Sequence, residues 1–375
     1  MRGERVGRRL AGACGGSLRV LAAALAVPRA VKAAVALLAT AGLLLSVQGC
    51  GGTASAATAS GGLTRTSGLT PAAAMRVFDS YVTAEHVALA DRSELLALSL
   101  VTNGAYDLTV ASFHIAGHGP LPAYDYGKPT LYVPKLSTYP YWFMAAVSRT
   151  PASSGRGASA RPVVLVFDKS DADAQWTLDG TVALPPGTPP LPVAVGSSGY
   201  ATPLPTFDQA LKATPNVVGA LQAAVVDGGP ASPSAAVVAA GPQTTGMYRT
   251  YSAAAHQATA LQETYQWELD GVHDPVFTLR TTDGGGLVYY TMHLDTLAQI
   301  SSAAARSHGH RSPVSPIPIP PAFRPLLPLH QPPVHHELAT EQTLQYLALV
   351  PPASAHAAKI QVIGVGGGPT SASAH

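Results

Sequence analysis

The densest group of side chains able to contact a ligand is aromatic and lies between residues 124 and 143. Aromatic residues make up only 6% of the chain, yet this stretch holds Tyr124, Tyr126, Tyr132, Tyr139, Tyr141, Trp142 and Phe143. Such rings could line a surface for a ligand or a glycan, but rings on strands also cover the apolar area of a sheet. Packing at the mouth of the first sheet is the favoured explanation for these rings. Tyr126 and Trp142 are the predicted ligand-binding residues.

Five histidines in or beside a proline-rich stretch raise the question of a metal site. They are His308, His310, His330, His335 and His336, with Glu337 as the nearest carboxylate. Neutral imidazoles bind zinc or copper, but the ligands need a scaffold that fixes their geometry. The irregular spacing here is typical of a solvated loop. We therefore predict no metal and no cofactor.

Candidates for acid–base catalysis lie in the first half of the chain, since proton transfer needs a titratable group facing a pocket. They are Asp79, Asp107, His114 and Asp125, each of which also suits an exposed or capping position. Residues 196–199, Gly-Ser-Ser-Gly, lack the spacing of a nucleophile turn. The glycines of residues 364–368 are followed by no Lys and no helix pattern, unlike a phosphate loop. The catalytic residues stay unassigned.

Cys50 closes an apolar run that follows a basic segment. The run, Ala33 to Val47, has 15 residues, whereas a membrane-spanning helix needs about 20. This layout is that of a signal peptide. Its end, Val-Gln-Gly-Cys, resembles a bacterial lipobox, in which the cysteine receives diacylglycerol before cleavage, although Gln48 replaces the usual Ala, Ser or Thr. We predict a lipoprotein signal peptide over 1–49 and lipidation at Cys50; plain secretory cleavage and an uncut anchor are the alternatives.

Lipidation at Cys50 predicts the location of the mature chain. Acyl chains hold a protein at a membrane because each buried methylene contributes about 0.8 kcal/mol. Residues 50–69 are mostly Gly, Ser, Thr and Ala and predict a flexible tether. The other cysteine, Cys14, lies within the signal peptide, so no intramolecular disulfide is expected. The expected location is the extracytoplasmic face of the cell membrane, with the membrane as partner.

Charge and composition exclude one class of partner. The first 32 residues hold seven Lys and Arg against Glu4 alone, a charge of +6, so the rest carries −4 of the total +2. A nucleic-acid-binding surface needs clustered Lys and Arg, and we predict none. With 47% apolar residues in 375, a sizeable buried core is expected.

Helices followed by strands are predicted for a first domain, residues 70–204. Thr70 and Pro71 are typical of a helix start, and Asp91 with Glu94 forms a capping-box pattern. These signals predict helices over 71–90, from about 94, and over 104–115. Short runs rich in Tyr, Val and Phe then predict strands, at residues 130–134, 141–149, 162–168 and 175–184.

A second domain, residues 205–366, repeats that order. Helices are predicted over 207–227 and 245–267. Strands are predicted over 275–281, 286–295, 339–350 and 359–365. Asp283-Gly284-Gly285-Gly286 indicates a hairpin, because glycine tolerates positive φ. Residues 301–333 are too rich in proline for a strand and predict an insertion loop, and residues 367–375 predict a disordered tail. The fold class is α+β, with two helix-then-antiparallel-sheet units.

The aromatic motifs resemble those of a family of actinobacterial lipoproteins of unknown function. The residues that carry the resemblance are Tyr132-Val133-Pro134-Lys135, Tyr139 to Phe143, Leu165-Val166-Phe167, Trp176 and Pro275-Val276-Phe277. The resemblance covers most of residues 70–366. It implies an extracytoplasmic lipoprotein whose units are similar to the nuclear-transport-factor-2-like cone fold, in tandem. It brings no catalytic residues with it.

Three functional hypotheses follow from these observations. The favoured one is a noncatalytic lipoprotein that binds a small molecule, an envelope component or a protein partner, because no catalytic constellation stands out. The alternative is a small-molecule enzyme of the isomerase, cyclase or hydrolase type, which would need two titratable side chains converging in a pocket. A purely structural envelope protein is the third.

Overall fold

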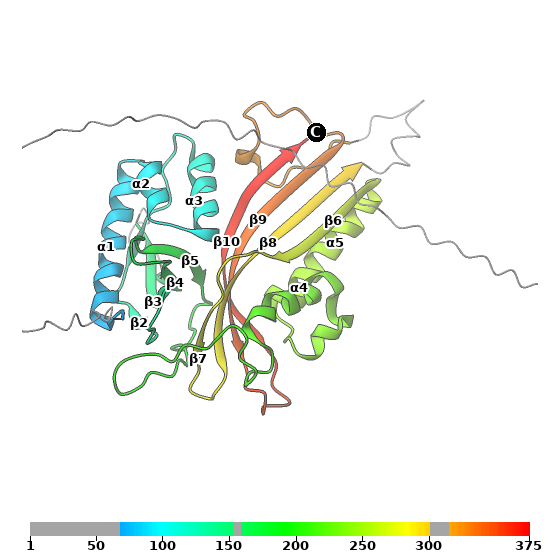
Figure 1. Ribbon diagram of the computed structural model, residues 1–375. Coiled ribbons are helices and arrows are strands. Elements are labelled where there is room, and N and C mark those ends of the chain that lie inside the picture. Colours follow the sequence, from blue (N-terminus) through cyan, green and yellow to red (C-terminus); the bar gives the residue numbers. More distant parts are fainter. Residues whose placement is uncertain (1–67, 153–158, 301–314) are drawn as a thin grey trace, which may run out of the picture. The chain divides into compact units, whose positions relative to one another are not determined.

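The computed structural model describes residues 68–152, 159–300 and 315–375 (Figure 1). These residues belong to one compact unit, Thr64–His375. The predicted signal peptide over 1–49, Cys50 and nearly all of the predicted tether over 50–69 lie outside the described residues. Within the described ranges, none of the helices has the length and apolar character needed to cross a membrane.

The first half begins with three helices, as predicted. They are α1 (Pro71–Ala90), α2 (Glu94–Ser99) and α3 (Asn103–Ala116). The Thr70 hydroxyl accepts a hydrogen bond from the backbone N–H of Ala73 at 3.1 Å, so Thr70 caps α1. Ser93, one residue before Glu94, caps α2 in the same way.

Five strands follow these helices and form an antiparallel meander. They are β1 (Tyr124–Tyr126), β2 (Thr130–Tyr132), β3 (Tyr141–Pro151), β4 (Arg161–Lys169) and β5 (Thr177–Ala183). Successive side chains of a strand point to opposite faces. On β3, Phe143, Ala145 and Val147 therefore pack toward α1, whereas Trp142 and Met144 face the other way.

The second half also places helices before strands, but the predicted helix bounds are too wide. The helices are α4 (Val218–Gly228) and α5 (Met247–Ala260), and the strands are β6 (Glu263–Gly271), β7 (Phe277–Arg280), β8 (Gly286–Ile300), β9 (Glu337–Val350) and β10 (Gln361–Ala374). Short helical turns lie at η1 (Pro215–Val217), η2 (Gly229–Ala231), η3 (Pro233–Ala236), η4 (Pro242–Gly246) and η5 (Arg324–Leu326). Residues 207–214 are not helical, and Trp267 lies on β6 rather than on a helix.

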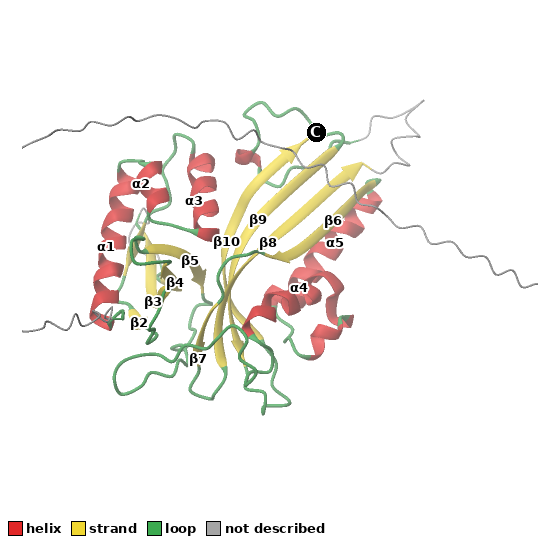
Figure 2. Ribbon diagram, viewed as in Figure 1, coloured by secondary structure: helices red, strands yellow, loops and turns green. Residues whose placement is uncertain are grey.

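All ten strands join in one antiparallel sheet, where the repeated order had suggested two units. The strand order is β1-β3-β4-β5-β10-β9-β8-β6, with β2 on β3 and β7 on β8. The two halves meet where Ala183 of β5 pairs with Val365 of β10. Figure 2 shows the long strands β8, β9 and β10 beside the shorter strands of the first half. The fold is therefore α+β with helices packed on a single sheet.

Alternation along β8 shows how the layers stack. Val288, Tyr290 and Met292 lie in one buried cluster with α4. Leu287 and Tyr289 point the other way and lie in a second cluster with Trp142 and Met144 of β3. Strand β8 is thus covered by α4 on one face and by strands of the first half on the other. The first-half strands carry α1 on their far face.

The prediction of a disordered tail over 367–375 is wrong. Ser371 to Ala374 continue β10 and pair with residues 338–341 of β9. The backbone carbonyl of His375 accepts hydrogen bonds from the N–H groups of His336 and Glu337. Gly and Ser have low strand propensity. Here β9 runs beside the whole of β10, and backbone pairing with it holds these residues in a strand.

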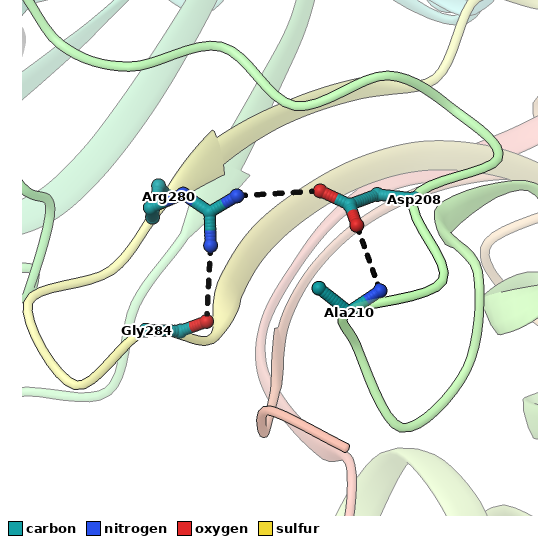
Figure 3. A network of polar contacts seen from close by, with 4 residues as sticks. All are labelled: Asp208, Ala210, Arg280 and Gly284. Atoms are coloured by element: carbon teal, nitrogen blue, oxygen red, sulfur yellow. Dashed lines mark hydrogen bonds and ion pairs between the residues drawn. The ribbon is translucent and has the colours of Figure 1, made fainter. Parts of the chain in front are cut away.

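The predicted hairpin at Asp283–Gly286 is confirmed between β7 and β8, and Gly284 has a φ of 85°. Arg280 connects this turn to the loop that holds Asp208 and Ala210 (Figure 3). Its guanidinium lies 3.4 Å from Asp208 Oδ2 and donates to the carbonyl of Gly284 at 3.4 Å. Asp208 Oδ1 accepts from the N–H of Ala210 at 2.8 Å. With the Arg280 side chain 35% exposed, such an ion pair contributes at most about 1 kcal/mol.

Candidate functional site

A cavity of about 330 Å³ lies between helices α1, α2 and α3 and the sheet. Strands β1, β3, β5, β9 and β10 complete its wall. Its volume is within the range of small-molecule sites. We call it the Glu85 pocket. Most of its lining is apolar and includes Ala88, Leu89, Leu100, Ala105, Leu108 and Phe113.

Helical spacing brings these side chains to one surface. On α1, Tyr81, Glu85 and Ala88 are four and three residues apart and therefore share a face. On α3, Ala105, Thr109 and Ser112 repeat that spacing. Both helices thus turn a mostly small or apolar stripe toward the pocket.

Glu85 is the carboxyl group of the pocket. Its Oε1 accepts hydrogen bonds from the hydroxyls of Tyr81 at 2.9 Å and Tyr126 at 3.3 Å. Its Oε2 is buried and has no hydrogen-bond partner among the described residues. Burial raises the pKa of Glu85, and the two tyrosine hydrogen bonds oppose that rise. Oε2 is thus a buried, unsatisfied acceptor on a residue that lines the cavity.

The tyrosines beside Glu85 remain protonated donors. Burial, together with the nearby Glu85 carboxylate, raises the pKa of Tyr81 and of Tyr126 well above the ordinary value. Their hydroxyl hydrogens therefore stay available to Oε1. This leaves Oε2 as the free position of the carboxyl group.

Arg149 supplies the positive charge of the pocket. It lies near the end of β3, directly opposite Tyr126 of β1 in the strand register. Its guanidinium carbon is 4.1 Å from the ring centroid of Tyr124, a cation–π contact. Among the described residues, Arg149 forms no ion pair. The pocket thus holds one carboxyl group and one guanidinium that do not neutralise each other directly.

A buried polar network lies behind the pocket. Asp179 of β5 is completely buried and accepts a hydrogen bond from the side-chain amide of Asn103. Burial raises the pKa of Asp179 to about 7. Gln345 donates to the carbonyl of Asp179 at 3.0 Å and accepts from the N–H of Thr181 at 2.8 Å. Since Gln345 and Thr181 also line the pocket, the network forms part of its floor.

The structure separates the two predicted ligand-binding residues. Tyr126 lies in the Glu85 pocket. Trp142 is only 6% exposed, and its ring lies 4.9 Å from that of Phe277 in the core between the strand layers. It does not line the Glu85 pocket, although it is one of the residues that line a separate hollow near Pro203.

The other candidates of the sequence are scattered on the surface. Exposed positions hold Asp79, Asp107, His114, Asp125, His330, His335 and His336, while His308 and His310 lie outside the described residues. None of the four acid–base candidates lines the Glu85 pocket. In the described part of the chain, no three His, Cys, Asp or Glu side chains are grouped to hold a metal ion.

Glu85 and Arg149 were not found from the sequence. Glu85 follows Ala74, Phe78 and Tyr81 at helical spacing, so it continues the buried stripe of α1. A carboxylate on an otherwise buried helix face could have marked Glu85 as a site residue. Nothing in the sequence marked Arg149, because its position in the pocket depends on the pairing of β1 with β3.

Comparison with known proteins identifies the family of the chain. Residues 65–374 match the family described as a domain of unknown function, DUF8094. A protein of Streptomyces avermitilis described as an uncharacterized lipoprotein is 29% identical over 228 residues, which cover 59% of this chain and 64% of that relative, a little under two thirds of its length. No solved structure matches the chain. Because the family match spans nearly all of the described residues, the chain belongs to the DUF8094 family.

Proposed function

We propose that this protein is a lipid-anchored lipoprotein of the cell envelope that binds a small molecule in the Glu85 pocket. One observation carries the binding proposal: the Glu85 carboxyl lies in a largely apolar cavity with Oε2 buried and without a partner. Leaving a buried acceptor unsatisfied costs about 1–3 kcal/mol, and a ligand that donates to it recovers that cost. Tyr126 is then a ligand contact, whereas Trp142 would contact a ligand only in the separate hollow near Pro203.

The proposed anchor is the acylated Cys50, at the extracytoplasmic face of the membrane. The lipobox-like residues before Cys50 and the lipoprotein name of the Streptomyces relative support it. Mass spectrometry of the N-terminal peptide from host membranes tests it. We expect a chain that begins at Cys50 and carries diacylglycerol. A chain that begins at another residue would contradict the anchor.

The two halves support a proposal about the fold. Each runs from helices into antiparallel strands, so residues 70–204 and 205–366 are proposed as tandem cone-like domains that share one sheet, with residues 301–333 as an insertion in the second. In a cone-like fold a curved sheet wraps around helices and leaves a pocket between them. The Glu85 pocket lies between the helices of the first half and the sheet, with β9 and β10 of the second half in its wall. A solved structure of a relative in which only one half is present would test the division.

Native mass spectrometry tests the binding proposal. The full chain is extracted from host membranes and measured beside the Ser112→Trp variant, in which the indole fills the pocket from α3. We expect a defined adduct on the lipidated wild-type chain that the variant lacks. A bare lipidated mass for both proteins would contradict binding of a small molecule at this site.

Catalysis in the same pocket is the second candidate function. It is favoured by the burial that raises the pKa of Glu85, because a general acid or base works best with a pKa near the working pH. The adduct found by mass spectrometry is the substrate to test. Turnover of that compound by wild type and its loss in Glu85→Gln would support an enzyme, whereas unchanged compound after long incubation would support binding alone.

A further inference from the structure

Two opposite charges line the Glu85 pocket without forming an ion pair with each other. Oε1 of Glu85 accepts hydrogen bonds from two tyrosine hydroxyls, whereas Oε2 has no hydrogen-bond partner among the described residues. Arg149 rests on the Tyr124 ring and pairs with no carboxylate of the described residues. Tyr126 links the two sites, because it bonds to Glu85 and lies opposite Arg149 across the strands.

This arrangement selects against a ligand that carries a single charge. An ammonium group at Glu85 would bring a second cation near Arg149, and a carboxylate at Arg149 would bring a second anion near Glu85. An uncompensated charge is costly in an apolar cavity. A neutral group that has both a donor and an acceptor can bind to both protein groups and brings no net charge into the cavity.

We propose that the Glu85 pocket recognises an apolar molecule through a neutral amide group, whose N–H donates to Oε2 of Glu85 and whose carbonyl oxygen accepts from Arg149. The apolar part of the ligand lies against Ala88, Leu100 and Phe113, which line the same cavity. The inference rests on the proposed small-molecule function and adds the chemical class of the ligand. Hydrogen bonds that involve a charged protein group are about twice as strong as neutral ones, so both contacts contribute to selection.

A series of probes with one chain length and different head groups tests this class. Octanamide, octanoate, octylamine and 1-octanol are compared by saturation-transfer NMR on the full lipidated chain in phosphatidylcholine nanodiscs. Nanodiscs that carry Ser112→Trp give the signal from partition into lipid, which is subtracted. We expect octanamide to bind at least tenfold more tightly than octanoate or octylamine. Equal or tighter binding of either charged probe would overturn the inference.

Two variants assign the two contacts. In Arg149→Met the repelling cation is gone while Glu85 remains, so the preference should move toward octylamine. In Glu85→Leu the anion is gone while Arg149 remains, so the preference should move toward octanoate. If circular dichroism shows that Glu85→Leu does not fold, Arg149→Met alone decides, because Arg149 is only partly buried. An unchanged preference for octanamide in Arg149→Met would contradict the carbonyl contact.

The outcomes separate the ligand class from the proposed function. Pocket-dependent binding of another probe without octanamide would make the amide class wrong and leave small-molecule binding standing. Failure of all four probes would also contradict the amide class. In that case the adduct found on the chain from host membranes decides the proposed function independently.

Discussion

Asp179 shows what full burial does to a single carboxyl group. It has no exposed surface, its Oδ1 has no described partner, and its other oxygen meets Asn103. Desolvation disfavours the charged form, and the pKa rises to about 7. Asn103 has a φ of 49°, in the left-handed region that asparagine tolerates better than most residues.

Asp179 predicts a loss of stability at rising pH. The folded state holds the proton up to about pH 7, whereas the unfolded chain releases it near pH 4. The unfolded state is therefore increasingly favoured between these values, by up to about 4 kcal/mol. We expect Asp179→Asn to remove this part of the pH dependence and to be the more stable protein at pH 8. Urea unfolding at pH 5 and pH 8 measures both, and equal pH dependence in the two proteins would contradict the account.

A row of carboxylates on the second half predicts a stabilising substitution. Glu268, Asp295 and Glu341 lie directly opposite one another on β6, β8 and β9. Burial raises the pKa of Asp295, and the neighbouring Glu341 raises it further. Like charges in opposite positions destabilise a sheet. Glu341→Gln should therefore lower the pKa of Asp295, measured by NMR titration. It should also raise the free energy of unfolding by about 0.5 kcal/mol. The control is Glu94→Gln at an exposed position of α2, which should leave the pKa of Asp295 unchanged.

At the scale of single residues, the sequence predicted part of the candidate site. Tyr126 was found because aromatic residues are rare in this chain and therefore conspicuous. Glu85 was missed because its burial depends on β1, whose Tyr126 lies 41 residues further along the chain. Trp142 was predicted to bind a ligand but lies in the core. An aromatic side chain on a strand can point to either face of the sheet, and the sequence does not say which face borders a pocket.

At the scale of elements, the sequence correctly predicted features that depend on short-range backbone geometry. The Thr70 cap and the Asp283–Gly286 turn were both predicted, because each is a short-range backbone requirement. The helix expected from residue 207 begins only at Val218, since Pro215 holds Thr214 in an extended conformation with ψ of 142°. Residues 263–267 were assigned to a helix, yet Tyr265, Trp267 and Leu269 alternate as a strand does, and pairing with β8 fixes that choice.

Gly180 predicts a large cost for one added methyl group. A Cβ at this position of β5 would lie 2.0 Å from the hydroxyl of Tyr289 and 2.8 Å from the side chain of Gln345. Overpacking of this kind typically costs about 1–3 kcal/mol. We expect Gly180→Ala to lose stability in that range, measured by urea unfolding. Gly271→Ala on β6 is the matched control, because its Cβ would meet nothing within 4 Å, and an equal loss in both would contradict the steric explanation.

The C-terminal half of β10 predicts that the last residues stabilise the protein. Ala372 and Ala374 pack on a buried cluster that contains Ala298 and Leu338. Deleting residues 371–375 removes these contacts and the pairing with β9. We expect a lower Tm for the shortened chain, by roughly 2–4 °C for each kcal/mol lost in a protein of this size. An unchanged Tm would indicate the loose tail that composition suggested.

At the scale of the whole molecule, the α+β class followed from the order of the elements, but the joining of the halves did not. That joining depends on β10, where a Cβ on Gly366 would lie 1.7 Å from the carbonyl oxygen of Thr181. Glycine alone allows this close approach between β10 and β5. Gly364 and Gly366 therefore allow β10 to approach β5, and this role could be recognised only once the neighbouring strand was known.

Whether the Glu85 pocket holds a small molecule can be seen in a crystal structure of the lipidated chain as purified from host membranes. We expect density for a bound compound in the cavity between α1, α3 and the sheet, with a donor group within hydrogen-bond distance of Oε2 of Glu85. Density in which Oε2 is satisfied by water or by the protein, with the cavity closed by its own side chains, would contradict the proposal.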